Sequence, residues 1–222
     1  MYKTPRRMQT LHHPTPYSFS TMRAILAAVT MLQALINGDC LFCEQCFAVH
    51  TSSCSGIFTQ CPPDVTHCVK GLENSTLGTD VILSVFKDCL SPSQKPDCGR
   101  EFSFKTPTAF FRISRTCCDS DFCNAGDVQV PAVDETPNGY KCEECFIYQS
   151  TDECSPTGEV QCTGKQNTCG SLSGTILRPG EAGRQYSFKG CTTRDFCKLG
   201  IFNMAGSQAY NYRLKCSPAL EP

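Results

Sequence analysis

Cysteine is the residue type with the most chemistry in this sequence, since 19 of the 222 residues are cysteines. That is about one residue in twelve, several times the share in an ordinary globular protein. Two Cys-x2-Cys pairs, Cys43 with Cys46 and Cys142 with Cys145, could bind zinc or exchange disulfides. A cytosolic protein with so many reduced thiols would be prone to oxidation, so the composition instead favours disulfides in an oxidising, extracellular compartment.

The spacing of the cysteines repeats along the chain. Eight cysteines of the first half recur in the second half at an offset of 99 to 102 residues, namely Cys43 and Cys142, Cys46 and Cys145, Cys54 and Cys154, Cys61 and Cys162, Cys68 and Cys169, Cys89 and Cys191, Cys98 and Cys197, and Cys117 and Cys216. The neighbouring residues agree too, as in Phe42-Cys-Glu-Gln-Cys-Phe47 and Lys141-Cys-Glu-Glu-Cys-Phe146. A zinc or redox site does not explain this register, so we favour structural disulfides in two copies of one module.

Other groups that could do chemistry are few. After residue 38 the only histidines are His50 and His67, and a nucleophile–base pair would need one of them buried beside a free nucleophile. His67 adjoins Cys68 and His50 lies in a polar run, so we expect both to be solvent-exposed. We therefore predict that the chain is not an enzyme and needs no cofactor or metal.

Charge excludes one class of partner. The sequence has 20 Lys and Arg against 21 Asp and Glu, and no basic stripe that could neutralise a run of phosphates. We therefore expect no nucleic-acid partner. Residues 1–38 carry four basic and no acidic side chains, so the rest of the chain has 16 against 21, a net charge of −5.

The first 38 residues contain no cysteine and are expected to lie outside the folded part. Met22 and Arg23 precede a mostly apolar run over 24–36, which is typical of a secretory signal peptide cleaved near Gly38. The alternative, a membrane-spanning helix, would need about 20 apolar residues. Residues 1–21 are an expected upstream extension, with Met22 as initiator. The last residues, 217–222, contain no apolar tail for a lipid anchor, so we expect a freely secreted product without a membrane anchor.

The segments that must hold the cysteines have the period of two that is typical of half-buried strands. It is clearest over 111–113 and 210–214, while 81–86 and 175–177 are apolar or β-branched runs at corresponding positions. No segment after Ile36 keeps a helical period. The fold class predicted is all-β and disulfide-rich, with domains at 39–126 and 142–222. Residues 127–141, with two prolines and a glycine, form the predicted linker.

The pattern is recognisable at this point. A Cys-x2-Cys start and the finish Cys117-Cys118-Asp-Ser-Asp-Phe-Cys123-Asn124 resemble the three-finger domain of the Ly-6 and urokinase-receptor superfamily. The tandem arrangement and the run Cys162-Thr-Gly-Lys-Gln-Asn-Thr-Cys169 are similar to the secreted γ-type phospholipase A2 inhibitors and their relatives. The resemblance covers both modules.

A disulfide pairing comes with this resemblance, although the sequence alone allows many others. The implied pairs are Cys43–Cys68, Cys46–Cys54, Cys61–Cys89, Cys98–Cys117, Cys118–Cys123, Cys142–Cys169, Cys145–Cys154, Cys162–Cys191 and Cys197–Cys216. Asn124 would tie the end of the first module back by hydrogen bonds. The second module lacks the last small loop, because Ser217 stands where a second adjacent cysteine would be.

Three features stay open at the level of sequence. Cys40 has no counterpart, and it could cross-link another chain, replace Cys43 as a partner, be capped or be removed by cleavage. Asn74-Ser75-Thr76 is a sequon in a Gly-, Glu- and Thr-rich stretch, so we expect an exposed, glycosylated loop. Aromatic residues gather near the third finger of each module, some for the core and others for a contact surface: Phe102, Phe104, Phe110, Phe111, Tyr210 and Tyr212.

Three functions compete. The resemblance implies a secreted binding protein that inhibits a secreted phospholipase A2 through protein–protein contact. A soluble ligand or modulator of a cell-surface receptor or protease in the same superfamily is the alternative, and a redox or zinc protein is the third. Self-association of the chain is left open.

Overall fold

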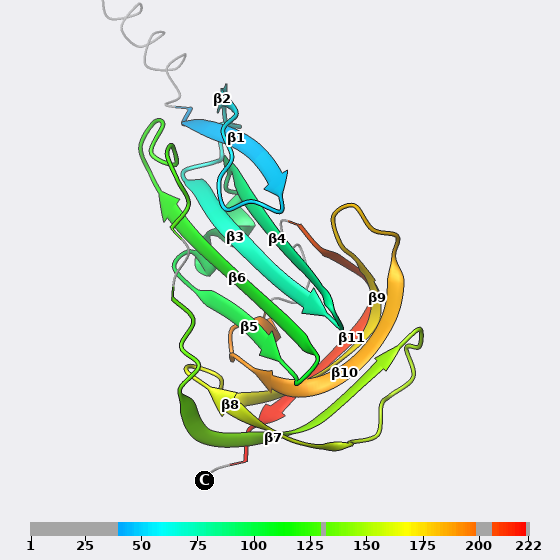
Figure 1. Cartoon of the computed structure of the whole chain (residues 1–222). Helices are drawn as coiled ribbons and strands as arrows, with labels where there is room; N and C mark the ends of the chain where they lie inside the picture. The colour runs from blue at the N-terminus through cyan, green and yellow to red at the C-terminus, as the bar shows by residue number, and fades with distance from the viewer. Residues whose placement is uncertain (1–39, 130–131, 199–205, 221–222) are drawn as a thin grey trace, which may run out of the picture. The chain divides into compact units, whose positions relative to one another are not determined.

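Strands are the main secondary structure of the described chain, which comprises residues 40–129, 132–198 and 206–220 of a computed structural model (Figure 1). The signal-peptide prediction over 1–38 lies outside the described residues. The strands are β1 (Phe42–Val49), β2 (Ile57–Gln60), β3 (Cys68–Leu77), β4 (Asp80–Cys89), β5 (Glu101–Lys105), β6 (Ala109–Cys118), β7 (Pro137–Tyr148), β8 (Gly158–Thr163), β9 (Thr168–Leu177), β10 (Arg184–Thr192) and β11 (Gln208–Pro218), with the short 3-10 helices η1 (Pro92–Asp97) and η2 (Phe196–Lys198). The predicted fold class, all-β and rich in disulfides, is confirmed.

The two modules share a plan of five strands, and within the described ranges the first module also has β5, paired with β6. In the first module β3 is central, with β4 and β6 antiparallel on either side, while β1 pairs with β2 and β4. In the second module β9 is central between β10 and β11, and β7 pairs with β8 and β10. The alternation that the period of two predicts is interrupted where consecutive side chains are buried, as at Leu72 and Glu73 in β3 and at Val85 and Phe86 in β4.

The modules join through their strands. The end of β10 pairs with β5, with Cys191 opposite Lys105 and Thr192 opposite Phe104, so that one sheet order runs β11-β9-β10-β5-β6-β3-β4-β1-β2. Gly190 makes this approach possible, because a Cβ there would collide with the Lys105 carbonyl oxygen. Residues from Cys40 onward form a single compact unit.

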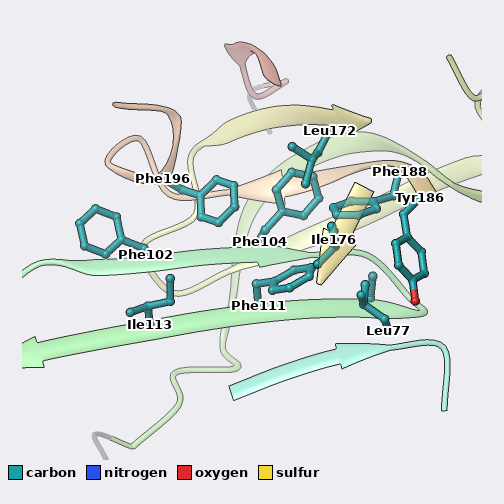
Figure 2. Close-up of a cluster of buried hydrophobic side chains, with 11 residues drawn as sticks. Leu77, Phe102, Phe104, Phe111, Ile113, Leu172, Ile176, Tyr186, Phe188 and Phe196 are labelled. Carbon is teal, nitrogen blue, oxygen red and sulfur yellow. The ribbon is translucent and has the colours of Figure 1, made fainter. Parts of the chain in front are cut away.

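A hydrophobic core lies across this junction (Figure 2). The ring of Phe104 from β5 meets Phe188 from β10 edge-on, with 5.0 Å between ring centroids, and lies 5.5 Å from Phe196 of η2. Phe111 from β6 stacks on Phe188 at 5.9 Å. All four rings are fully buried. The two modules therefore share their largest apolar cluster instead of each enclosing its own.

Polar contacts close the junction around the core. The Glu73 carboxylate in β3 is fully buried and accepts hydrogen bonds from the backbone amides of Gly206 and Ser207, at 3.0 and 3.1 Å, and from the Ser207 hydroxyl. Burial raises the pKa of Glu73 above its ordinary value, although these bonds and the charge of Arg115 oppose the rise. The buried Arg178 donates to the Asp80 carbonyl oxygen at 2.8 Å and thereby ties the second fingers together.

The predicted linker, 127–141, is partly ordered by packing. Val128 is buried against Leu72 and Val85, and β7 begins inside the range at Pro137. The Asn138 amide fixes this start by donating to two backbone carbonyls of the β8–β9 turn. The domain boundaries themselves stay predictions. No helix in the described ranges is long and apolar enough to span a membrane.

Candidate interaction surface

Nine disulfides hold the three fingers of each module at one end. They are Cys43–Cys68, Cys46–Cys54, Cys61–Cys89, Cys98–Cys117 and Cys118–Cys123 in the first module, and Cys142–Cys169, Cys145–Cys154, Cys162–Cys191 and Cys197–Cys216 in the second. Every pair joins cysteines of the same module, as in the pairing that the resemblance implies. With so few apolar residues per module, these cross-links supply much of the stability.

Sulfur atoms gather in a way that could suggest a metal site. The Sγ atoms of Cys43, Cys61 and Cys89 lie within 4.8 Å of one another, and an equivalent trio forms in the second module. All six cysteines are disulfide-bonded. A zinc ligand must be a thiolate, so the clusters are disulfide knots and offer no ligand.

Asn124 stabilises the base of the first module, which is the end at which the disulfides hold the three fingers together. Its side chain is fully buried, accepts from the Glu44 amide at 2.9 Å, and donates to the carbonyl oxygens of Glu44 at 2.9 Å and Val69 at 3.1 Å. One carboxamide thus bonds three backbone groups and links β1 to β3, two strands that are not neighbours in the sheet.

The second module ends differently. Leu220 donates its backbone N–H to the Lys141 carbonyl oxygen at 3.1 Å, just as Phe122 does to Phe42 at 2.7 Å. Ser217 stands where the first module has Cys118, the first half of the Cys118–Cys123 disulfide. A cleft of about 410 Å³ lies at this base, lined by Glu143, Gly170 and Leu220 among others.

The two modules also differ in whether they bury an ion pair. Lys87 and Glu44 form an ion pair at 2.8 Å, and both side chains are almost fully buried. Burial alone would raise the pKa of Glu44, but the hydrogen bonds from Lys87 and Gly56 and the charges of Lys87 and Lys70 together hold the pKa below its ordinary value. The matching Lys189 is 3.9 Å from Glu143 and 3.8 Å from Glu153, both well exposed. The first module therefore depends on its ion pair more than the second does.

The sequon does not lie in a loop. Asn74 is in the middle of β3, paired with Leu83 on one side and Arg112 on the other, and it is half-buried. The expectation of an exposed loop is therefore wrong, because sheet pairing overrides the polar composition of the stretch. Glycosylation of Asn74 stays a prediction.

Two further sequence candidates can be placed. His50 is exposed, whereas His67 is half-buried with its Nδ1 atom 2.8 Å from the Thr66 hydroxyl. The hydroxyl that His67 contacts belongs to the exposed Thr66, the residue next to it in the chain. Cys40 is the free cysteine of those ranges and is half-buried.

The aromatic residues near the third finger divide as core and surface. Phe102, Phe104 and Phe111 are fully buried at the junction, and Phe110 and Tyr212 are half-buried. Only Tyr210, with 46% of its surface accessible, is well exposed. Most of these aromatic residues therefore pack at the junction between the two modules.

Exposed apolar side chains gather elsewhere, on the first two strands and the last loop of the first module. Phe58 and Phe122 expose 47% and 48% of their surface, and their ring centroids are 5.0 Å apart. We did not predict these positions from sequence, although one signal was present. A loop closed by Cys118–Cys123 is too short to enclose a ring, so Phe122 must point outward.

Known proteins resemble the chain along both modules. The family model of the u-PAR/Ly-6 domain matches residues 40–126 and again 138–219. A phospholipase A2 inhibitor of the gamma-subunit type from Elaphe climacophora is 29% identical over 194 residues, which cover 84% of this chain and 91% of that protein. Protein RoBo-1 of Rattus norvegicus is 33% identical over 89 residues, 40% of this chain and 35% of its own.

A solved structure also aligns with the chain. The crystal structure of mouse TEX101 has 18% sequence identity and a TM-score of 0.34, over 80% of this chain and 98% of that one. The paired β-modules, their disulfide knots and the two matches of the domain model lead to one conclusion: the chain belongs to the u-PAR/Ly-6 family and carries its domain twice.

Proposed function

We propose that the chain is a secreted, non-enzymatic binding protein that inhibits a secreted phospholipase A2 by covering part of the enzyme's surface. The observation that carries the proposal is the similarity to the gamma-type phospholipase A2 inhibitor of Elaphe climacophora, which runs through both modules. A second such inhibitor, from Laticauda semifasciata, is 32% identical over 115 residues. Similarity over most of both chains supports a shared mode of action, which a match to one module would not.

Binding without catalysis agrees with the chemistry of the described residues. The cysteines that could act as nucleophiles are disulfide-bonded apart from Cys40. The charges at the second module's cleft neutralise one another, since Lys189 and Lys215 both lie within 4 Å of Glu153. What the chain offers a partner is therefore extended protein surface.

The joined modules offer that surface as one piece. Typical protein–protein interfaces bury about 1,600 Å² in total, which a single three-finger module supplies only with difficulty. Because β5 and β10 pair and the core crosses the junction, a target that contacts both modules loses no entropy in aligning them.

The test is a titration of the purified protein against a panel of secreted phospholipases A2. A soluble short-chain substrate below its micelle concentration removes the lipid surface, so inhibition cannot come from coating the substrate. We expect stoichiometric inhibition of at least one enzyme, with no turnover by the chain itself. A lipid-free binding assay should give the same affinity.

The control is the same protein after reduction and alkylation, which should lose inhibition because the knots hold the fingers together. Isolated modules are a poor control, since separation would expose Phe104 and Phe188. If no enzyme of a broad panel binds at micromolar concentration, the proposal fails. Modulation of a receptor or protease then becomes the function to test.

A further inference from the structure

The base of the first module carries an aromatic cluster in which Phe58 and Phe122 are well exposed and Phe42 is half-buried. Phe42 in β1, Phe58 in β2 and Phe122 in the last loop form it, with ring centroids of Phe42 and Phe122 5.9 Å apart and those of Phe58 and Phe122 5.0 Å apart. The register pairs Phe42 with Gln60 and Glu44 with Phe58, which places Phe42 and Phe58 on one face. These strands lie at the end of the sheet order opposite β11 (Figure 1).

The same positions of the second module hold no aromatic residue. Lys141 and Glu159 stand where Phe42 and Phe58 do, and they form an exposed ion pair at 3.7 Å. Leu220 stands where Phe122 does. The fold therefore does not require aromatic residues at these positions, and the three rings of the first module call for an explanation other than folding.

The backbone at Phe122 adds a second, independent sign. Its φ is +61°, in the left-handed region that favours glycine or asparagine and is unfavourable for a bulky residue. The Cys118–Cys123 disulfide and the bond from the Phe122 amide to the Phe42 carbonyl oxygen hold this conformation. Residues in such sparsely populated backbone conformations cluster at active sites, ligand clamps and switch regions.

Negative charge borders the rings. Asp119 and Asp121 lie in the same short loop as Phe122, and both are exposed. Asp121 accepts the Phe42 amide at 2.9 Å, and within the described ranges no Lys or Arg forms an ion pair with either aspartate. Ring faces beside carboxylates attract Arg and Lys side chains through cation–π and ionic contacts.

We propose that the aromatic base patch, made of Phe42, Phe58, Phe122, Asp119 and Asp121, is the docking surface for a basic loop of a target protein. A Lys or Arg of that loop would lie over the rings, and its charge would face the two aspartates. For the identity of the target this proposal rests on the proposed function. The two aspartates disfavour binding to a membrane, because the surfaces of biological membranes are neutral or anionic and would repel them.

The main experiment measures affinity for a phospholipase A2 that the wild-type protein inhibits. The double variant Phe42→Lys/Phe58→Glu copies the second module's own residues and should fold. Phe122→Gly relieves the left-handed backbone and should keep or raise the melting temperature. Each is expected to weaken binding tenfold or more, as for a central anchor of an interface. Phe47→Ala is the matched control, since Phe47 is 49% exposed but lies outside the patch, and should stay within twofold.

The charges have their own test. Asp119→Asn/Asp121→Asn keeps the acceptor for the Phe42 amide and removes both charges. It should lower the association rate several-fold at low salt and converge with wild type at about 1 M salt, where the Debye length is ~3 Å.

A third experiment tests the aromatic base patch without any enzyme. The chain has no tryptophan, so Phe58→Trp introduces a single fluorescent reporter into the patch. A peptide of alternating Arg and Leu should shift its emission to the blue, whereas a Glu–Leu peptide and phosphatidylcholine vesicles should not.

The outcomes separate the two proposals. If the wild type inhibits an enzyme and the patch variants bind it as tightly, the docking surface is refuted and the proposed function stands. If no enzyme binds but the basic peptide shifts the reporter, the proposed function fails and the docking surface stands. A shift with vesicles alone, or with neither probe, overturns the docking surface.

Discussion

Truncation of Phe104 to alanine tests whether the two modules fold as one. The ring is fully buried, and it contacts Phe188 and Phe196 of the other module. It also lies against Gly170, where an added Cβ would be 2.6 Å from the ring. Such tight packing leaves little freedom for neighbours to fill the cavity that alanine would leave.

The expected loss follows from that burial. Phe→Ala at a buried site costs about 3–5 kcal/mol, and the tight packing places this one in the upper part of the range. For a unit of this size each kcal/mol lowers the melting temperature by about 2–4 °C, so the fall should be about 10 °C or more. The loss should appear in both modules because the ring packs on residues of both.

Hydrogen exchange with disulfides intact reports on each strand separately. In Phe104→Ala, amide protection should fall in β9 and β10 of the second module as much as in β3 and β4 of the first. The exposed Phe47→Ala variant should change stability by less than about 1 kcal/mol. Wild-type protection of β9 and β10 in Phe104→Ala, or a second unfolding transition at its wild-type temperature, would refute the shared core.

Single residues give three further predictions. The pKa of Glu73 is raised in the folded state, so as the pH falls the folded protein takes up a proton before the unfolded chain does. The free energy of unfolding of the wild type should therefore rise relative to that of Glu73→Gln between pH 7 and the ordinary pKa of 4.5. Calorimetry that shows a constant difference between the two proteins would contradict this. Asn124→Ala removes three buried hydrogen bonds to the Glu44 and Val69 backbone and should cost about 3 kcal/mol in urea unfolding. A loss below about 1 kcal/mol would be the contrary result. Secreted Asn74→Gln and Thr76→Ala should each lose the mass of one N-glycan, and unchanged masses would show that the sequon is unused.

Much of the fold could be predicted because its determinants are local or periodic. The period of two over 111–113 and 210–214 lies in β6 and β11, and the cysteine register revealed the duplication. Asn74 was misplaced because a polar, glycine-containing run reads as a loop. It is a strand because β4 and β6 pair with it on both sides, which no local pattern records.

The contact between the two modules could not be predicted from the sequence, for a different reason. Phe102, Phe104 and Phe111 would show the same alternation whether they covered their own module, a partner or the other module. Pairing of β5 with β10 is a contact between strands some 90 residues apart, and its enabling residue, Gly190, resembles any strand glycine in sequence. The clustering of Phe42, Phe58 and Phe122 in the aromatic base patch could not be predicted, because the three residues come from separate segments of the sequence.

The junction also limits where a partner can bind. Rings that a lone three-finger module would leave on one face of its sheet are covered here by the second module, so they cannot contact a target without breaking the core. Recognition must then use surfaces that the junction leaves free, and among these the two bases differ most: three rings with two carboxylates in one module, a solvated ion pair in the other. A duplication keeps its disulfide knots in both copies because each copy needs them to fold. Because folding does not fix the residues at the base, the copies can diverge there, and this is where we expect specificity for a target to be encoded.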